Sequence, residues 1–321
     1  MQIKVLIGLA PGLPEAVPEL RKEYPQVKFE SILEVDDLEA AIADADVYVG
    51  ILNRDLFLAA KRLKWIQAPS AGVEAFLAIP ELVESDVRLT NARGVNSASV
   101  AESAMAMILA FTRGIREAVL SQQKHAWSFY EIRSRMVELT GSTMGIIGLG
   151  AIGRALAQRA KAFGLRILAV DINPVQKPDE VDALWGIDRL DDLLRQSDYV
   201  VITVPYTPQT RNMIGEEQLA LMKPSAMLVA ISRGGIVDEK ALARALREKR
   251  LAAAALDVFE TEPLPPDSEL WDIPNLLITP HIAGATQYET QRLLALFREN
   301  LNRFLEGQFP LINEVDKLRG Y

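Results

Sequence analysis

Residues 144–154 read MGIIGLGAIGR, and this stretch indicates the architecture of the chain. The apolar run 144–147 predicts a buried strand. Three glycines with the spacing G-x-G-x-x-G follow that strand: Gly148, Gly150 and Gly153. Helical periodicity over 154–163 and a second apolar run over 166–170 then lead to Asp171. The stretch therefore predicts a strand, a glycine turn, a helix and a second strand with an acidic end.

Each glycine has a separate role in binding the pyrophosphate of a dinucleotide. Gly148 permits a tight turn, Gly150 leaves no side chain between backbone and pyrophosphate, and Gly153 lets helix and strand pack closely. The first residues of the helix, Ala151 and Ile152, offer N–H groups and a partial positive charge to the phosphates. The motif alone is a weak signal, but its place between a strand and a helix makes it specific.

Asp171 lies about 20 residues beyond the glycines, where an acidic residue accepts hydrogen bonds from the adenosine ribose. Its charge repels a 2′-phosphate, and no Arg follows among Ile172, Asn173 and Pro174. The sequence therefore predicts NAD as cofactor and disfavours NADP.

Composition restricts the class of protein. The chain has 321 residues, enough for two domains, with 49% hydrophobic and 24% charged residues. The net charge of −8 and the lack of a basic stripe argue against nucleic acid or an anionic membrane as partner. With no cysteine, thiol catalysis, disulfides and thiolate metal sites are excluded, and no metal site is expected. No signal peptide or transmembrane run is evident, so a cytoplasmic location is expected.

Strand and helix signals alternate over the first 95 or so residues, a pattern typical of an α/β domain with a parallel sheet. The segment after its first strand, 8–14, lacks the glycine motif. We therefore expect a flavodoxin-like substrate-binding domain made of 1–96 and 286–321, and an NAD-binding Rossmann domain made of 97–285. The predicted fold is α/β, with two parallel-sheet domains and a cleft between them.

A largely apolar stretch predicts one long helix from Ser97 to Leu120, buried between domains or subunits. Glu102 lies inside it, and a buried carboxylate needs a partner. The more polar residues 121–140 predict a loop or arm, in which His125 is expected at the surface.

Polar residues follow four later strands, at the edge where parallel sheets bind ligands. The segments are 204–210, 231–235, 257–264 and 280–284. In the second, Arg233 beside two glycines can hold a carboxylate through two parallel hydrogen bonds. In the fourth, His281 is suited to exchange a proton near neutral pH. Glu262 is the expected partner of His281, because their strands should be neighbours.

These segments, in this order after the glycine motif, resemble the D-isomer-specific 2-hydroxyacid dehydrogenase family over essentially the whole chain. That family includes relatives acting on glyoxylate, hydroxypyruvate, D-lactate and phosphoglycerate. The resemblance implies that Arg233 binds the substrate carboxylate and carbonyl, that His281 is the acid/base, and that Glu262 pairs with His281. It also implies hydride transfer between the nicotinamide and C2 of a 2-oxo acid, and domain closure over the substrate.

The resemblance implies two sets of binding residues. Those expected to contact NAD are Gly148, Gly150, Ala151, Ile152, Gly153, Asp171, Val204, Pro205, Thr210, Ile231, Ser232, Arg233, Asp257, His281 and Gly284. Those expected to contact substrate are Ser70, Ala71, Gly72, Arg233 and His281. A homodimer built on the nucleotide domain is also implied, with residues 105–109 at or near its interface.

Three alternatives remain open from the residues alone. A formate dehydrogenase pairs its His with Gln, and Glu262 argues against it. A dinucleotide-sensing corepressor with little turnover keeps the same three residues, so they do not exclude it. A phosphoglycerate dehydrogenase needs a basic pocket for the substrate phosphate. The sequence leaves the 2-oxo acid open among glyoxylate, hydroxypyruvate, pyruvate and larger acids, and Ser232 and Tyr206 depart from the common family pattern.

Overall fold

The computed structural model describes residues 2–10, 12–173 and 176–320. Pro174, which belongs to the segment considered above for cofactor preference, lies outside them. The chain divides into two compact units: unit 1, residues 1–95 with 286–321, and unit 2, residues 96–285. Each unit has its own sheet, and every ladder in both sheets is parallel. The predicted α/β class with two parallel sheets is confirmed.

Unit 1 has a five-stranded sheet with the order β2-β1-β3-β4-β5, which is the flavodoxin-like order. Its strands are β1 (Ile3–Ile7), β2 (Val27–Ser31), β3 (Val47–Val49), β4 (Trp65–Gln67) and β5 (Arg88–Thr90). Its helices are η1 (Pro14–Ala16), α1 (Val17–Glu23), α2 (Leu38–Ile42), α3 (Arg54–Ala59), α4 (Glu74–Leu77), α5 (Pro80–Glu84) and α13 (Glu289–Glu306). The sheet's order reverses between β1 and β3.

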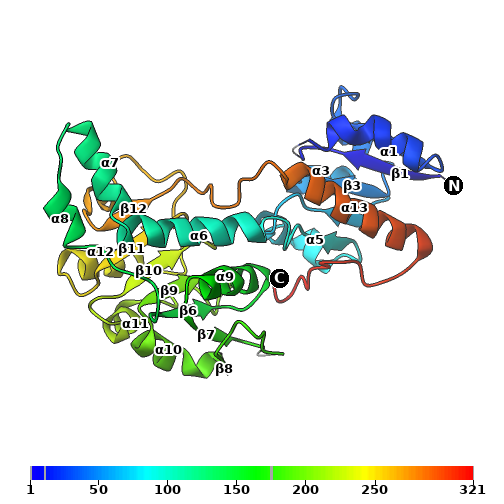
Figure 1. The fold of residues 1–321 in the computed structure, drawn as a ribbon. Helices are drawn as coiled ribbons and strands as arrows, with labels where there is room; N and C mark the ends of the chain where they lie inside the picture. Colours follow the sequence, from blue (N-terminus) through cyan, green and yellow to red (C-terminus); the bar gives the residue numbers. More distant parts are fainter. Residues whose placement is uncertain (1, 11, 174–175, 321) are drawn as a thin grey trace. The chain divides into compact units, whose positions relative to one another are not determined.

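Side chains that alternate along the strands of unit 1 enter two cores, one on each face of the sheet. Val5 and Ile7 pack with α1 and α13 on one face, whereas Leu6 and Tyr48 pack with α2 to α5 on the other. Figure 1 shows α1 and α13 on the same unit as β1 and β3, although α13 comes from the far end of the sequence. The C-terminal segment is thus a structural part of the N-terminal sheet.

Unit 2 has a seven-stranded sheet with the order β12-β11-β10-β9-β6-β7-β8. Its strands are β6 (Thr143–Ile147), β7 (Arg166–Asp171), β8 (Ala183–Gly186), β9 (Tyr199–Ile202), β10 (Met227–Ala230), β11 (Ala253–Leu256) and β12 (Leu276–Ile278). Its helices are α6 (Ser97–Thr112), α7 (Ile115–Gln123), α8 (Phe129–Arg133), α9 (Ala151–Ala162), η2 (Ile187–Arg189), α10 (Leu190–Gln196), α11 (Glu216–Leu221), α12 (Glu239–Arg247) and η3 (Glu269–Asp272). The sheet's order reverses between β6 and β9, and ligands of such sheets bind at the carboxyl ends beside this point.

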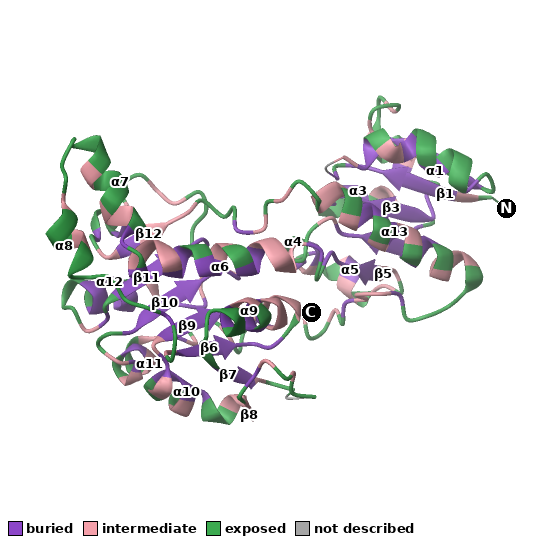
Figure 2. Ribbon diagram, viewed as in Figure 1, coloured by how far each residue is buried: buried purple, intermediate pink, exposed green. Residues whose placement is uncertain are grey.

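Helices cover both faces of the unit 2 sheet. Residues of α6 and α9 pack on one face, and residues of α10, α11 and α12 pack on the other. The strands between them are almost completely buried, as Figure 2 shows by their colour. Burial on both faces explains why these strands read as continuous apolar runs rather than alternating ones. It also leaves the loops at the strand ends as the places where polar chemistry can be exposed.

The predicted single helix 97–120 is wrong. The structure has two helices, α6 and α7, bent by 65° at the break. Gly114 adopts a left-handed conformation with φ of 63° at this point, which glycine reaches without the penalty that a Cβ incurs. Gly114 follows Arg113, the C-cap of α6, and a glycine at this place is a helix-stop signal that the sequence does contain.

The predicted burial of Glu102 is also wrong. Its side chain is 66% exposed and forms an ion pair with Arg159 of α9 at 2.8 Å. Met105, Met107 and Ile108, by contrast, are buried in the core of unit 2 itself. Two short helices, α4 and α5, and strand β8 were not predicted from the sequence.

No single helix in the described part of the chain is long and apolar enough to cross a membrane. In that part, only α6 and α7 taken together, as a bent pair, have the necessary length and composition.

Candidate active site

The glycine turn after β6 has the geometry that its sequence predicts. Gly148 has φ of 94°, a left-handed value that favours glycine. A Cβ on Gly153 would overlap the Gly148 carbonyl oxygen, so helix α9 packs tightly against the turn. At Gly150 an added Cβ would meet no described heavy atom within 4 Å. Two glycines are therefore required by the turn itself, and the third borders open space.

Helix α9 begins directly at this turn. Gly150 is its N-cap and provides no side-chain hydrogen bond, so no cap competes for the first N–H groups of the helix, at Ala151 and Ile152. A twelve-residue helix with an uncapped start carries partial positive charge at that end. These features fit a dinucleotide pyrophosphate at the turn.

Asp171 ends β7 next to the glycine turn. Its carboxylate accepts hydrogen bonds from the backbone N–H groups of Leu149 at 2.7 Å and Asn173 at 2.9 Å. These bonds fix the carboxylate beside the turn, where a ribose would lie. Arg154 of α9 donates to the carbonyl of Gln176, five residues beyond Asp171, at 3.4 Å. Sequence reasoning missed Arg154, because it considered only the residues directly after Asp171 and Arg154 precedes that residue.

The loop that follows β9 contains Val204, Pro205 and Thr210. The Thr210 hydroxyl donates to the Pro205 carbonyl at 2.8 Å, which closes the loop on itself. Val204 lies beside the glycine turn, because a Cβ on Gly148 would be 2.7 Å from Val204 Cγ1. The predicted loop segment is therefore placed next to the predicted cofactor turn.

The segment after β10 contains Ile231, Ser232 and Arg233. The Ser232 Oγ is buried and has no hydrogen-bond partner within the part of the chain that the structure describes. A buried hydroxyl without a partner calls for an explanation, and a bound ligand is one. Arg233 is half-buried, and its Nη1 donates to the Ser232 carbonyl at 2.7 Å.

Glu262 and His281 are brought together from two adjacent strands, β11 and β12. Their side chains meet with 2.6 Å between His281 Nδ1 and Glu262 Oε2, while Glu262 Oε1 accepts from the Phe259 N–H at 2.9 Å. The His281 side chain is 46% exposed, so the ring is accessible although Glu262 binds its Nδ1. Because Nδ1 faces the carboxylate, Nε2 is the ring nitrogen left to exchange a proton with another molecule.

His281 has a strained backbone. Its φ is 53°, in the left-handed region that a residue with a Cβ enters at a cost of about 1–2 kcal/mol. Asp257, 1% exposed, holds this turn: its carboxylate accepts from the Thr279 hydroxyl and from the N–H groups of Ile282 and Ala283. The family resemblance implies that Asp257 contacts the cofactor, and in the structure its carboxylate binds the turn that carries His281. Thr279 is a residue that sequence reasoning missed.

The remaining predicted positions lie on two different units. Gly284 follows the His281 turn in unit 2, where its carbonyl accepts from the Ser99 hydroxyl at 3.0 Å. Ser70, Ala71 and Gly72 follow β4 in unit 1, where the Ser70 hydroxyl donates to the Gly72 carbonyl at 2.7 Å and the Ala71 carbonyl accepts from Asn91. His125 is exposed, as expected.

Comparison with known proteins shows the family of the chain. Residues 105–283 match a family model described as "D-isomer specific 2-hydroxyacid dehydrogenase, NAD binding domain". A glyoxylate reductase of Korarchaeum cryptofilum is 37% identical over 289 residues, which cover 87% of this chain and 86% of that protein. The crystal structure of a D-isomer specific 2-hydroxyacid dehydrogenase of Xanthobacter autotrophicus, in complex with NADPH and MES, has a TM-score of 0.84 at 28% identity and covers 100% of both chains.

A D-3-phosphoglycerate dehydrogenase of Methanocaldococcus jannaschii is 36% identical over 313 residues. The match covers 95% of this chain but 58% of that protein, so the chain spans little more than half of this relative's length. The model match and the identity over most of the sequence define the class: the chain belongs to the D-isomer specific 2-hydroxyacid dehydrogenase family, and it is an oxidoreductase.

Proposed function

We propose that this protein reduces a small 2-oxo acid to the 2-hydroxy acid with NADH, and that glyoxylate is the first substrate to test. The observation that carries the proposal is the 2.6 Å pair of His281 and Glu262 at the carboxyl ends of β11 and β12. This pair lies on the same sheet as the open glycine turn after β6. The name of the relative from Korarchaeum cryptofilum suggests glyoxylate.

The turn at Gly148, Gly150 and Gly153, the start of α9 and Asp171 would hold the dinucleotide, with the loops at 204–210 and 231–232 beside it. When bound, the reduced nicotinamide supplies the hydride for C2 of the substrate. His281, protonated on both nitrogens, donates from Nε2 to the carbonyl oxygen as it gains negative charge. Glu262 orients the ring and stabilises its charged form.

Arg233 would bind the substrate carboxylate through two parallel hydrogen bonds and polarise the carbonyl. In the oxidation direction, the neutral His281 ring accepts the hydroxyl proton instead. The backbone of Ser70, Ala71 and Gly72 in unit 1 is the second proposed carboxylate contact. Asp257 acts on this reaction by holding the His281 turn.

NAD(H) is the proposed cofactor, because the Asp171 carboxylate repels a 2′-phosphate. Arg154 acts in the opposite direction, since its guanidinium is a cation that contacts the segment after Asp171. We expect the fixed carboxylate to dominate, because its two backbone hydrogen bonds hold it at the turn, whereas Arg154 makes one long contact.

We also propose a homodimer, with an interface different from the one first expected. The side chains of Met105, Met107 and Ile108 are occupied inside unit 2, whereas α7, α8 and their connection expose large apolar side chains. These are Ile115, Val119, Leu120, Trp127, Phe129 and Tyr130. An exposed apolar surface of this kind is typical of an interface, and the mass of the protein in solution tests it.

The test of the activity is oxidation of NADH and NADPH with glyoxylate, hydroxypyruvate, pyruvate and larger 2-oxo acids. Turnover with NADH should exceed that with NADPH, and His281→Ala should lower kcat by about 10²–10⁴-fold. Asp171→Ala should weaken NADH binding by about 10-fold and reduce the preference of the enzyme for NADH over NADPH. Tight NADH binding without turnover of any acid would instead support a dinucleotide-sensing protein.

A further inference from the structure

Glu239 lies next to the proposed catalytic pair although no motif of that pair contains it. It is the first residue of α12, and Asp238 before it caps the helix by accepting from the Ala241 N–H at 2.9 Å. The Glu239 side chain therefore does not cap its own helix. Instead its Oε1 accepts a 2.6 Å hydrogen bond from the backbone N–H of Glu260, two residues before Glu262.

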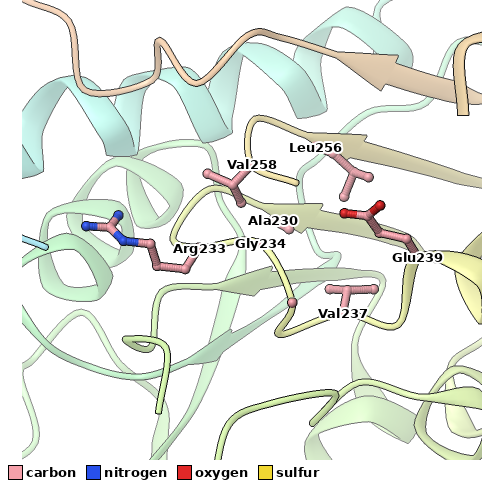
Figure 3. Close-up of a pocket in the computed structure, with 8 residues that line it drawn as sticks. Ala230, Arg233, Gly234, Val237, Glu239, Leu256 and Val258 are labelled. Carbon is pink, nitrogen blue, oxygen red and sulfur yellow. The ribbon is translucent and has the colours of Figure 1, made fainter. Parts of the chain in front are cut away.

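Glu239 also lines a small pocket at the ends of β10 and β11. The pocket is lined by Ala230, Arg233, Gly234, Gly235, Val237, Glu239, Leu256 and Val258. Figure 3 shows the Glu239 carboxylate pointing toward the middle of this group, while the Arg233 side chain extends in the opposite direction. One segment, 233–239, thus supplies a proposed substrate-binding residue at one end and Glu239 at the other.

The peptide between Phe259 and Glu260 is held from two sides by this segment. A Cβ on Gly234 would overlap the Phe259 carbonyl, so the two backbones are in direct contact there. Glu239 binds the N–H of the same peptide unit. The next N–H back along the chain, that of Phe259, donates to Glu262 Oε1 at 2.9 Å. Movement of this peptide would therefore move the carboxylate that holds His281.

A carboxylate is costly at this place. Burial raises the pKa of Glu239 above its ordinary value, and the negative charges of Glu260, Glu262 and Asp238 raise it further, against the opposing effect of the Glu260 N–H. The charged groups around Glu239 are these three acids and Arg233, which lines the same pocket. A residue kept at a cost to stability indicates a role in function.

We propose that Glu239 is a positioning residue, which holds the Phe259–Glu260 peptide and so fixes Glu262 against His281. This inference rests on the proposed function, because it assigns Glu262 and His281 to the reaction. Glu239 touches neither reacting atom in this scheme. Its effect passes through one hydrogen bond to the loop that carries Glu262.

The experiment compares three variants with the wild-type protein, after wild-type turnover has established the activity. Glu239→Ala removes the acceptor and should lower kcat by about 10–100-fold, because small displacements of a catalytic group are costly, with KM for NADH within about 3-fold. Glu239→Gln keeps an acceptor oxygen and should stay within about 3-fold of wild type. Glu239→Asp keeps the charge but shortens the side chain, and should be impaired like Glu239→Ala.

The kcat-against-KM split and the recovery in Glu239→Gln separate positioning from general stability. A merely structural role would lower the melting temperature of Glu239→Ala and leave kcat per folded enzyme at the wild-type value. Glu217→Ala is the matched control, since Glu217 is an exposed acid in the first turn of the neighbouring helix α11. It should leave both kcat and KM for NADH at their wild-type values.

Two results would overturn the proposal: wild-type kcat per folded enzyme in Glu239→Ala, whatever its melting temperature, or impairment of Glu239→Gln equal to that of Glu239→Ala. If Glu239→Ala does not fold, the contrast of Glu239→Asp with Glu239→Gln decides the question. Failure of the wild type to turn over any 2-oxo acid would instead contradict the proposed function.

Discussion

A turn that contains glycine follows the first strand of each sheet, and a glycine in each turn has different surroundings. In unit 1, β1 ends before Gly8, where a Cβ would overlap the phenol of Tyr48 from the unit's own core. In unit 2, β6 ends before a turn in which Gly150 borders open space. Gly8 therefore makes room for the Tyr48 side chain, whereas Gly150 borders the open space in which we propose that the dinucleotide binds.

Matched alanine substitutions test this difference directly. Gly150→Ala places a methyl group where the pyrophosphate is expected and should weaken NADH binding by about 10–100-fold, with little change in stability. Gly8→Ala should destabilise the protein by about 1–3 kcal/mol, because the added methyl overpacks the core beside Tyr48. Its NADH affinity should stay at the wild-type value. Calorimetric binding and denaturant unfolding measure both; loss of stability in Gly150→Ala with normal binding would contradict the comparison.

Each unit also buries one aspartate, 1% exposed in both cases. In unit 1, Asp46 accepts from the Lys4 N–H at 3.1 Å and pairs with Arg62 and Lys64 at 3.2 and 3.0 Å. Burial alone would raise the pKa of Asp46, but the hydrogen bonds from Lys4 and Lys64 and the charges of Lys64 and Arg62 outweigh it and hold the pKa below its ordinary value. In unit 2, neutral donors from the His281 turn bind Asp257.

An Asp→Asn substitution should therefore affect catalysis in unit 2 and stability in unit 1. Asp257→Asn should lower kcat by about 10-fold, because the left-handed turn at His281 loses an acceptor. Asp46→Asn should leave kcat unchanged and lower stability above the unfolded pKa of the aspartate, where the native ion pairs are formed. The stability difference between Asp46→Asn and wild type should disappear as pH falls through the lowered pKa. Equal kcat values in the two variants would contradict this assignment.

The smallest expected effect concerns Tyr48, the group that fills the turn of unit 1. Burial raises the pKa of Tyr48 from 10.0 to about 12. Because the folded pKa is the higher one, its contribution is fully present below pH 10 and is lost as pH rises toward 12, by roughly 2–3 kcal/mol. In Tyr48→Phe the free energy of unfolding should therefore fall less steeply as pH rises above 10. At neutral pH this variant should be less stable than wild type by about 1 kcal/mol, because it lacks the hydrogen bond to the Ile51 carbonyl.

Denaturant midpoints measured across this pH range test the prediction. An unchanged alkaline slope in Tyr48→Phe would show that the phenol is not protected by the core of unit 1.

The sequence by itself predicted the features that depend on local pattern. Apolar runs of strand length predicted most strands, and the glycine spacing after 144–147 predicted the turn and the start of α9. Because carboxyl ends of neighbouring parallel strands meet at one edge, the order of the motifs was enough to pair His281 with Glu262. The expected contact is present at 2.6 Å. The catalytic and cofactor-binding roles of these residues remain proposals for the experiments above.

Tertiary structure alone decided which polar groups were buried and what they bound. Glu102, which interrupts an apolar stretch, is exposed beside Arg159, whereas Asp257, which follows an apolar stretch, is buried under the His281 turn. The contact of Glu239 with the Glu260 N–H joins residues 21 positions apart, and Glu239 belongs to none of the sequence motifs. Periodicity reports the face that a residue occupies within its own element, whereas burial and hydrogen bonding depend on partners from distant elements. For this reason the sequence predicted the fold but not the contacts that position the candidate site.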